Sequence, residues 1–258
     1  MGWPEGTRLK MDWLSLETQV RLISGLIVVV AGYTFWMGQL EICGLPGNYT
    51  NPVLALELVT KGEHIDQINR SEKEVDGKRV TANAFLSTQL RKDSGFIILY
   101  VLLFSLVALL LMRLTSAPWK GIALSGIICA VVGGILDFVE NSGMRKALAL
   151  TQGGATNDLA KIIRYPSLAK WALVFVCLLL IGISFLWGQT RVGVCACGCG
   201  VLLFLSGVVG LFGVIFNLYK PQFNPLFPGA VGLQALGFSW MAVVFFFFPS
   251  KLVASFSS

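Results

Sequence analysis

The chain has 258 residues, of which 55% are hydrophobic and only 13% charged, and its formal net charge is +6. Soluble domains carry about 25% charged residues, so this composition excludes an ordinary soluble fold and favours a polytopic membrane protein. The excess of Lys and Arg shows no basic patch interleaved with aromatic residues, and we therefore expect no nucleic acid partner.

Six apolar segments are long enough to cross about 30 Å of hydrocarbon as helices. They are expected at residues 21–40, 95–113, 119–139, 171–187, 193–217 and 229–248. Backbone polar groups in lipid must be paired within the protein, and no segment here alternates like a barrel strand. The sequence therefore predicts an all-α bundle of about six transmembrane helices, forming a single membrane domain over 1–258.

Two polar segments between the predicted spans are substantial. Residues 41–94 are expected to form a polar insertion with short amphipathic helices between the first and second spans. Residues 142–170 are expected to form a basic loop between the third and fourth spans, with Pro166 opening the fourth helix. These two segments set the boundaries of the predicted domain organisation.

The distribution of basic residues predicts the orientation. Thirteen of the 20 Lys and Arg residues lie in the first, third and fifth loops, and the other seven lie in the tails, the even-numbered loops and at the start of the first span. Basic residues collect in cytoplasmic loops, so the odd-numbered loops are placed in the cytoplasm and both termini on the non-cytoplasmic side. We expect an integral protein of the plasma or inner membrane.

The third span carries a stripe of small and then polar residues. On a helical wheel of about 100° per residue, this stripe occupies one side and bulky aliphatic residues occupy the other. Its small members are Gly126, Ala130 and Gly134, and its polar members are Asp137, Glu140 and Asn141. Small residues let helices approach closely, so we expect helix packing at these positions and also at Gly207 and Gly210 of the fifth span.

The predicted topology brings the polar end of the third span together with the starts of the second and fourth spans. One polar cluster is therefore expected, made of Asp93, Tyr100, Asp137, Glu140, Asn141 and Lys170. Carboxylates at a membrane boundary are costly unless they are paired, so we expect basic partners: Lys170, with Arg145 and Arg164 nearby in sequence.

Four sequence features occur together between residues 50 and 187. They are the "LALEL" segment, an Asp before an aromatic-rich second span, Asp-x-x-Glu-Asn at the end of the third span, and a Lys opening the next span. The residues are Leu54 to Leu58, Asp93 with Phe96 and Tyr100, Asp137 to Asn141, and Lys170. With these features the stretch resembles a family of uncharacterised bacterial multipass membrane proteins. The resemblance covers about half of the chain and implies the architecture, but it implies no activity.

The polar cluster leaves three interpretations open. It is a buried polar lock that fixes helix positions, a cation or proton site, or a site where a carboxylate acts as general base on lipid headgroups. We expect no catalytic residue and no metal site, because the single histidine, His64, lies in the first loop and no His-rich metal set occurs.

The leading functional hypothesis is a non-catalytic integral membrane subunit or scaffold. It would bind partner proteins or lipids through Gly-rich helix faces and cytoplasmic loops. The alternative is a small cation or proton transporter or channel that uses the carboxylate cluster, and a lipid-modifying membrane enzyme comes third. We expect no cofactor; membrane lipids, other membrane protein subunits and a second copy of the chain are the expected partners, and a bound lipid stays open.

Overall fold

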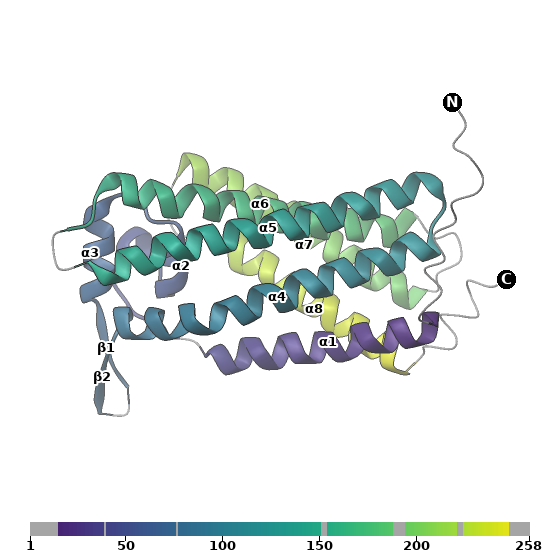
Figure 1. The fold of residues 1–258 in the computed structure, drawn as a ribbon, viewed down its shortest axis with the longest axis horizontal. Helices are drawn as coiled ribbons and strands as arrows, with labels where there is room; N and C mark the ends of the chain where they lie inside the picture. The colour runs from purple at the N-terminus through teal and green to yellow at the C-terminus, as the bar shows by residue number, and fades with distance from the viewer. Residues whose placement is uncertain are drawn as a thin grey trace.

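The structure is a bundle of long helices with a small cap at one end (Figure 1). It is a computed structural model, and it describes residues 15–38, 40–75, 77–150, 154–187, 194–220 and 224–247. In chain order the elements are α1 (Leu16–Met37), η1 (Pro46–Asn48), α2 (Pro52–Glu57), α3 (Gly62–Arg70), β1 (Glu72–Val75), β2 (Lys78–Thr81), α4 (Ala82–Leu114), α5 (Ala117–Ala149), α6 (Asn157–Trp187), α7 (Val194–Tyr219) and α8 (Leu226–Phe247).

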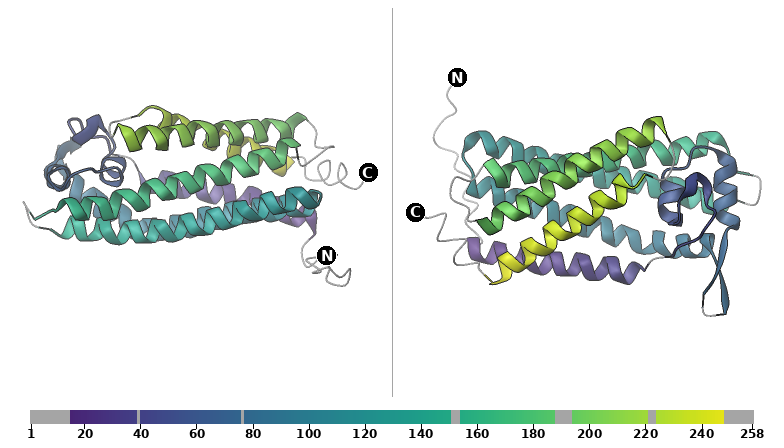
Figure 2. Two further views of the ribbon diagram at one scale, coloured as in Figure 1. Left: turned by 90° about the horizontal axis from the view of Figure 1, so that it is seen from above. Right: turned by 180° about the vertical axis from the view of Figure 1, so that it is seen from behind.

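Among the described residues, six helices are long and apolar enough to cross a membrane: α1, α4, α5, α6, α7 and α8. This confirms the predicted all-α polytopic bundle. The six helices run alternately in opposite directions, so the connections after α1, α5 and α7 lie at one end of the bundle (Figure 1). The start of α1 and the end of α8 lie at the other end (Figure 2). The predicted span limits 193 and 248 fall outside the described residues.

The cap consists of α2, α3 and the antiparallel hairpin β1–β2. Its first helix begins where the sequence favours a helix start: the Asn51 side chain accepts a hydrogen bond from Val53 N at 2.8 Å, and Pro52 occupies the first helical position. The amphipathic α3 buries Ile65 and Ile68 completely. The cap therefore has an apolar underside that packs on the bundle.

Hydrogen bonds attach the cap to α5 and to the start of α6. Asn69 Nδ2 donates to the Ala147 carbonyl at 3.0 Å, and Gly62 N donates to Asn157 Oδ1 at 3.0 Å. A side chain at Gly62 would overlap the backbone of Ala155, so this close approach requires glycine. We call this end of the bundle the capped end.

The second long helix begins earlier than the sequence predicted. The polar insertion was expected to run over 41–94, but α4 begins at Ala82. Thr81 Oγ1 caps the helix by accepting from Ala84 N at 3.2 Å, and Leu86 is buried in the first turns. Hydropathy identifies only the continuous apolar part of a helix. The first turns of α4 also carry polar residues and bury their apolar side inside the capped end, so hydropathy does not detect them.

The predicted basic loop over 142–170 is also largely helical. Helix α5 continues to Ala149 and α6 begins at Asn157, so Pro166 lies inside α6 rather than at its start. Pro166 lacks an N–H and removes one hydrogen bond from the helix, yet the helix runs through it. The prediction was wrong here because the additional turns bury Ile163 within the capped end, and this packing outweighs the local cost of proline.

The small stripe of α5 faces the interior of the bundle. Ala130 is fully buried, and a Cβ at Gly134 would lie 2.6 Å from Val101 Cγ2 of α4. At Gly126 the nearest side chains of α4 and α6 lie 4.0 Å from a built Cβ, a looser contact. On the opposite side Ile135 is 57% exposed, as expected for a lipid-facing residue.

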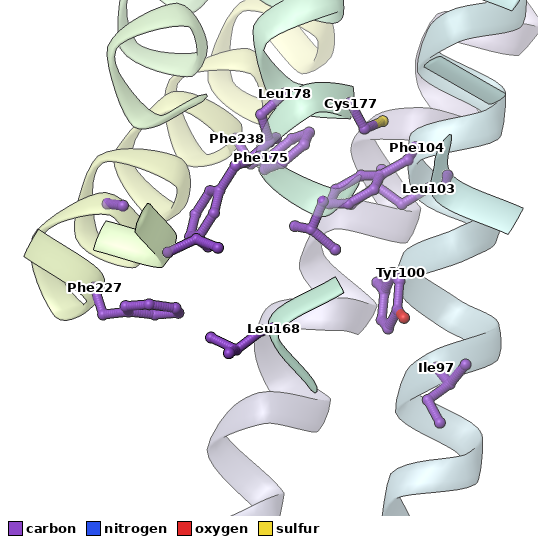
Figure 3. Packing of buried hydrophobic residues seen from close by; sticks show 14 of the residues in the cluster. Ile97, Tyr100, Leu103, Phe104, Leu168, Phe175, Cys177, Leu178, Phe227 and Phe238 are labelled. Carbon is purple, nitrogen blue, oxygen red and sulfur yellow. The ribbon is translucent and has the colours of Figure 1, made fainter. Parts of the chain in front are cut away.

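The glycines of α7 pack against α6 of the same chain. A Cβ at Gly207 would lie 2.7 Å from the Phe175 carbonyl oxygen, and a Cβ at Gly210 would overlap the Phe175 ring. Phe175 in turn packs against Phe227 of α8, with ring centroids 5.8 Å apart (Figure 3). The glycine-lined faces of α5 and α7 are thus occupied within the chain.

Candidate functional site: a buried charged cluster at the capped end

A lysine on α6 is the centre of the polar cluster. Lys170 Nζ lies 2.7 Å from Glu140 Oε2, 3.1 Å from Asp137 Oδ1 and 3.3 Å from Glu57 Oε1. The three carboxylates come from α5 and from α2 of the cap, so one ammonium joins two long helices and the cap. All four side chains are buried, and Glu140 has no exposed surface.

Glu57 is the member that sequence reasoning missed. It lies in the "LALEL" segment of the first loop, and it is separated from Lys170 by 113 residues. Its second carboxylate oxygen accepts a hydrogen bond from Trp171 Nε1 at 2.8 Å. The available signal was an acid on the apolar side of a short amphipathic helix, a position where a carboxylate needs a buried partner.

The other predicted members lie beside this centre. Tyr100 OH donates to Asp137 Oδ2 at 2.9 Å, which gives the second oxygen of Asp137 a partner as well. Asn141 Nδ2 donates to Asp93 Oδ2 at 2.6 Å and connects α5 with α4. The structure therefore brings Asp93, Tyr100, Asp137, Glu140, Asn141 and Lys170 together at the capped end.

The two arginines expected as further partners of the carboxylates bind backbone carbonyls instead. Arg145 donates to the Leu90 carbonyl at 3.2 Å. Arg164 donates to the carbonyl of Leu58 at 2.7 Å and to that of Asn217 at 2.5 Å. Arg164 thus connects α6 with the residue that ends α2 and with α7, because a planar guanidinium can serve two acceptors at once.

A tyrosine from the first loop completes the contacts around Arg164. Tyr49 OH donates to Asn217 Oδ1 at 3.1 Å. Burial of the Tyr49 hydroxyl raises its pKa to about 12, an effect that the nearby Arg164 charge opposes. Tyr49 stays neutral at physiological pH and acts as a hydrogen-bond donor, so the loop before the cap is also attached to the end of α7.

The cluster contains more carboxyl groups than basic groups. Glu57, Asp137 and Glu140 contact the single ammonium of Lys170, and Asp93 joins the cluster through Asn141. Among the described residues, Glu140 Oε1 has no hydrogen-bond partner although the side chain is fully buried. Such an atom is costly, so this is the least satisfied point of the cluster.

A larger cavity lies on the other side of Tyr100, away from the charged centre. It has a volume of about 790 Å³ and lies between α1, α4 and α8. A smaller cavity of about 310 Å³ lies between α4 and α5, beside Arg91 and Arg145. No carboxylate of the cluster lines either cavity.

Comparisons with protein families, with curated proteins and with solved structures find no match for this chain. The resemblance carried by Asp137 to Asn141 therefore stays a prediction, and the functional argument depends on the geometry of the site.

Proposed function

We propose that this chain is a non-catalytic integral membrane protein, a subunit or scaffold whose charged cluster locks the capped end of the bundle. The single observation that carries the proposal is the position of the Lys170 ammonium, which contacts carboxylates of α2 and α5 from its place on α6. Removing any one of these elements would leave buried charge without its partner, a cost of several kcal/mol. The cluster therefore favours one arrangement of cap and bundle.

The burial of the cluster supports a structural role over a chemical one. Asp137 is 7% exposed and Glu140 is fully buried, and two of the neighbouring groups, Tyr100 and Trp171, use their polar hydrogens to bind the carboxylates. A general base acting on a lipid headgroup needs a carboxylate that the headgroup reaches. No carboxylate of the cluster lines either of the two cavities described above.

The proposal no longer places partner binding on glycine-rich helix faces. Gly134, Gly207 and Gly210 contact neighbouring helices of the same chain, so they stabilise the monomer and are not available to a partner. In the proposal, partners bind the outer surface of the cap and its hairpin, which the cluster holds in place. The exposed side chains of β1–β2 include both acidic and basic residues and suit a polar partner surface.

A small proton or cation transporter is the second candidate, and one observation favours it. The cluster holds four carboxyl groups and one lysine, and Glu140 Oε1 has no hydrogen-bond partner among the described residues. An excess of buried carboxyl groups over bases is typical of sites that hold a proton or a cation. Tyr100 lies between this cluster and the large cavity, so it would be the point of access.

Reconstitution of the purified protein separates the two candidates. The protein is placed in liposomes that contain a pH-sensitive dye, and proton entry is followed after a pH step, with potassium and sodium gradients tested in parallel. The scaffold proposal predicts fluxes equal to those of protein-free liposomes. A flux that Glu140→Gln abolishes, while the variant remains folded and monodisperse, would refute the scaffold proposal and support the transporter.

A second experiment tests the scaffold role directly. The protein is extracted from its own membrane with a mild detergent and purified, and the co-purifying proteins are quantified. A scaffold predicts partners in fixed stoichiometry. Charge-reversing changes on the exposed hairpin, Lys73→Glu with Lys78→Glu, should release them with little change in thermal stability, because both side chains are exposed. Retention of every partner in that variant would exclude the hairpin as the binding surface.

A further inference from the structure

The large cavity is bounded by three helices that separate towards the capped end. Helices α1 and α8 are joined near the opposite end, where Ser24 Oγ donates to the Ala242 carbonyl at 3.0 Å. From there α8 crosses the bundle away from α1 (Figure 2, right). The space between them, closed at the back by α4, is the cavity of about 790 Å³. This volume lies within the range of about 300–1,000 Å³ for small-molecule sites.

The length of the cavity matches one leaflet of a bilayer. On α1 its lining runs from Ile27 to Gly38, and on α4 from Phe96 to Phe104. At 1.5 Å per residue these stretches cover about 16 Å and about 12 Å. The hydrocarbon core is about 30 Å thick, so the cavity extends through about half of it, on the side of the capped end.

The wall of the cavity is mostly apolar, and five of its fifteen lining residues are aromatic. Phe96, Tyr100 and Phe104 follow one another at intervals of four on α4, with adjacent ring centroids 5.7 and 5.8 Å apart. Phe104 stacks on Phe238 of α8 with ring centroids 5.6 Å apart, and Figure 3 labels Tyr100, Phe104 and Phe238. Four side chains in the wall carry polar groups. Tyr100 donates to Asp137 and Thr34 donates to the Val30 carbonyl, so both are engaged within the chain. The other two, Gln234 and Ser239, lie on α8. The cavity therefore suits an apolar chain better than a polar solute.

The cavity is open to the side. Ala31 of α1 and both Ala235 and Ser239 of α8 line it, and all three are exposed in the monomer. In a membrane, an opening between two spans faces lipid, so an acyl chain can enter without crossing an aqueous phase.

A cation lies at the capped end of this opening. Lys92 is one helical turn before Phe96, on the same side of α4, and its Nζ lies 4.1 Å from the centre of the Trp36 ring and donates to the Trp36 carbonyl at 3.0 Å. Tyr33 OH donates to the Lys92 carbonyl at 2.6 Å, which fixes the two helices together at this point. A Trp and a Lys at the end of a lipid-facing groove are typical of the headgroup level of a bilayer.

We propose that the cavity binds one acyl chain of an anionic phospholipid from the leaflet on the capped side, with the phosphate beside Lys92. This inference goes beyond the scaffold proposal and does not depend on it. The one-leaflet length selects a lipid chain, and the cation at the mouth selects an anionic headgroup. Bound in this position, the chain would separate α1 from α8 and contact the ring of Tyr100.

Photo-crosslinking maps the occupant. The full chain is placed in nanodiscs of phosphatidylcholine that contain phosphatidylglycerol with a diazirine in the acyl chain, and the labelled residues are identified by mass spectrometry. The proposal predicts labelling concentrated on the lining of α1, α4 and α8. Labelling spread evenly over lipid-facing residues, such as Ile135 of α5, would overturn it.

Two neighbouring positions of α8 provide a matched pair of variants. Ala235→Trp fills the cavity, whereas Leu236→Trp adds a similar side chain at a position that is 61% exposed and does not line the cavity. Native mass spectrometry of the delipidated protein with added phosphatidylglycerol should show about one retained lipid for the wild type and for Leu236→Trp, and none for Ala235→Trp. Equal lipid retention by both variants would overturn the proposal. If Ala235→Trp does not fold, the photo-crosslinking experiment on the wild-type chain tests the proposal instead.

The headgroup part of the proposal has its own test. Lys92→Gln should lower the preference for phosphatidylglycerol over phosphatidylcholine with the same chains by about fivefold, the value expected for one surface lysine. Lys120→Gln, an exposed lysine at the opposite end, should leave the preference unchanged. An unchanged preference in Lys92→Gln would remove the anionic headgroup from the proposal.

Discussion

Replacing the central lysine of the cluster tests the lock most directly. Lys170→Met keeps most of the side-chain volume and removes the charge that Glu57, Asp137 and Glu140 share. Removing one partner of a buried ion pair costs about 3–5 kcal/mol. Three carboxylates lose the ammonium at once, and the shortest N–O distance among these pairs is 2.7 Å. We therefore expect the free energy of unfolding to fall by about 5 kcal/mol, near the upper end of this range.

The measurement is reversible unfolding in mixed micelles of mild detergent and dodecyl sulfate, followed by circular dichroism. Lys161→Met is the matched control on the same helix, because that lysine pairs with Asp158 at the surface, where its side chain is 57% exposed, and no measurable change is expected. The double variant Lys170→Met with Glu140→Gln should recover part of the loss, since one unpaired charge is gone. A loss below about 1 kcal/mol in Lys170→Met would refute the lock, since that is the range of exposed ion pairs.

Three further predictions concern packing, the attachment of the cap, and pH. Gly207→Ala should destabilise the bundle by about 1–3 kcal/mol in the same unfolding assay, whereas Gly121→Ala, whose Cβ meets nothing within 4 Å, should be neutral or stabilising. Arg164→Met should leave two buried carbonyls unpaired and increase proteolysis within the cap under native conditions, and Arg164→Lys should not restore the wild-type rate, because an ammonium lacks the planar fork. Burial lowers the pKa of His64, so the unfolded state binds its proton more readily, and the stability of the cap should fall as pH drops through about 6.5. Hydrogen exchange of α3 at pH 5.5 and pH 7.5 checks this, and His64→Gln should abolish the difference.

The membrane class, the six helices and the inward stripe of α5 could be predicted from sequence because each depends on a local pattern. Apolar length identifies a span, and the helical period places Gly134 and Asp137 on one face. The ends of the helices could not be predicted in this way. The first turns of α4 and α6 are amphipathic and pack against the cap, so their boundaries depend on residues far away in the chain. Pro166 illustrates this, because its local preference for a helix start was overridden by packing.

The cluster was predicted to the extent that its members lie at the ends of spans. Topology alone brings Asp93, Asp137 and Lys170 to the same end of the bundle. The place of Glu57 on the apolar side of α2 indicates a buried partner, but which partner depends on how the cap folds over that end, and no pattern within the first loop identifies Lys170. The roles of the two arginines were misjudged for a related reason: charge suggests carboxylate partners, but buried backbone carbonyls at helix ends compete for the same donors.

The order of the charged residues along the chain has a consequence for biosynthesis. The acids of α2 and α5 leave the ribosome before Lys170, which is on the following long helix. Until α6 is inserted, the newly made hairpin of α4 and α5 holds its carboxylates at the bilayer boundary without a counter-ion. In this state, hydrated or protonated carboxyl groups have a lower free energy than buried carboxylate ions. Arrival of the lysine removes this cost and draws the cap onto the bundle in the same step. A nascent chain halted after α5 should therefore keep its cap accessible to added protease, and a chain extended through α6 should protect it.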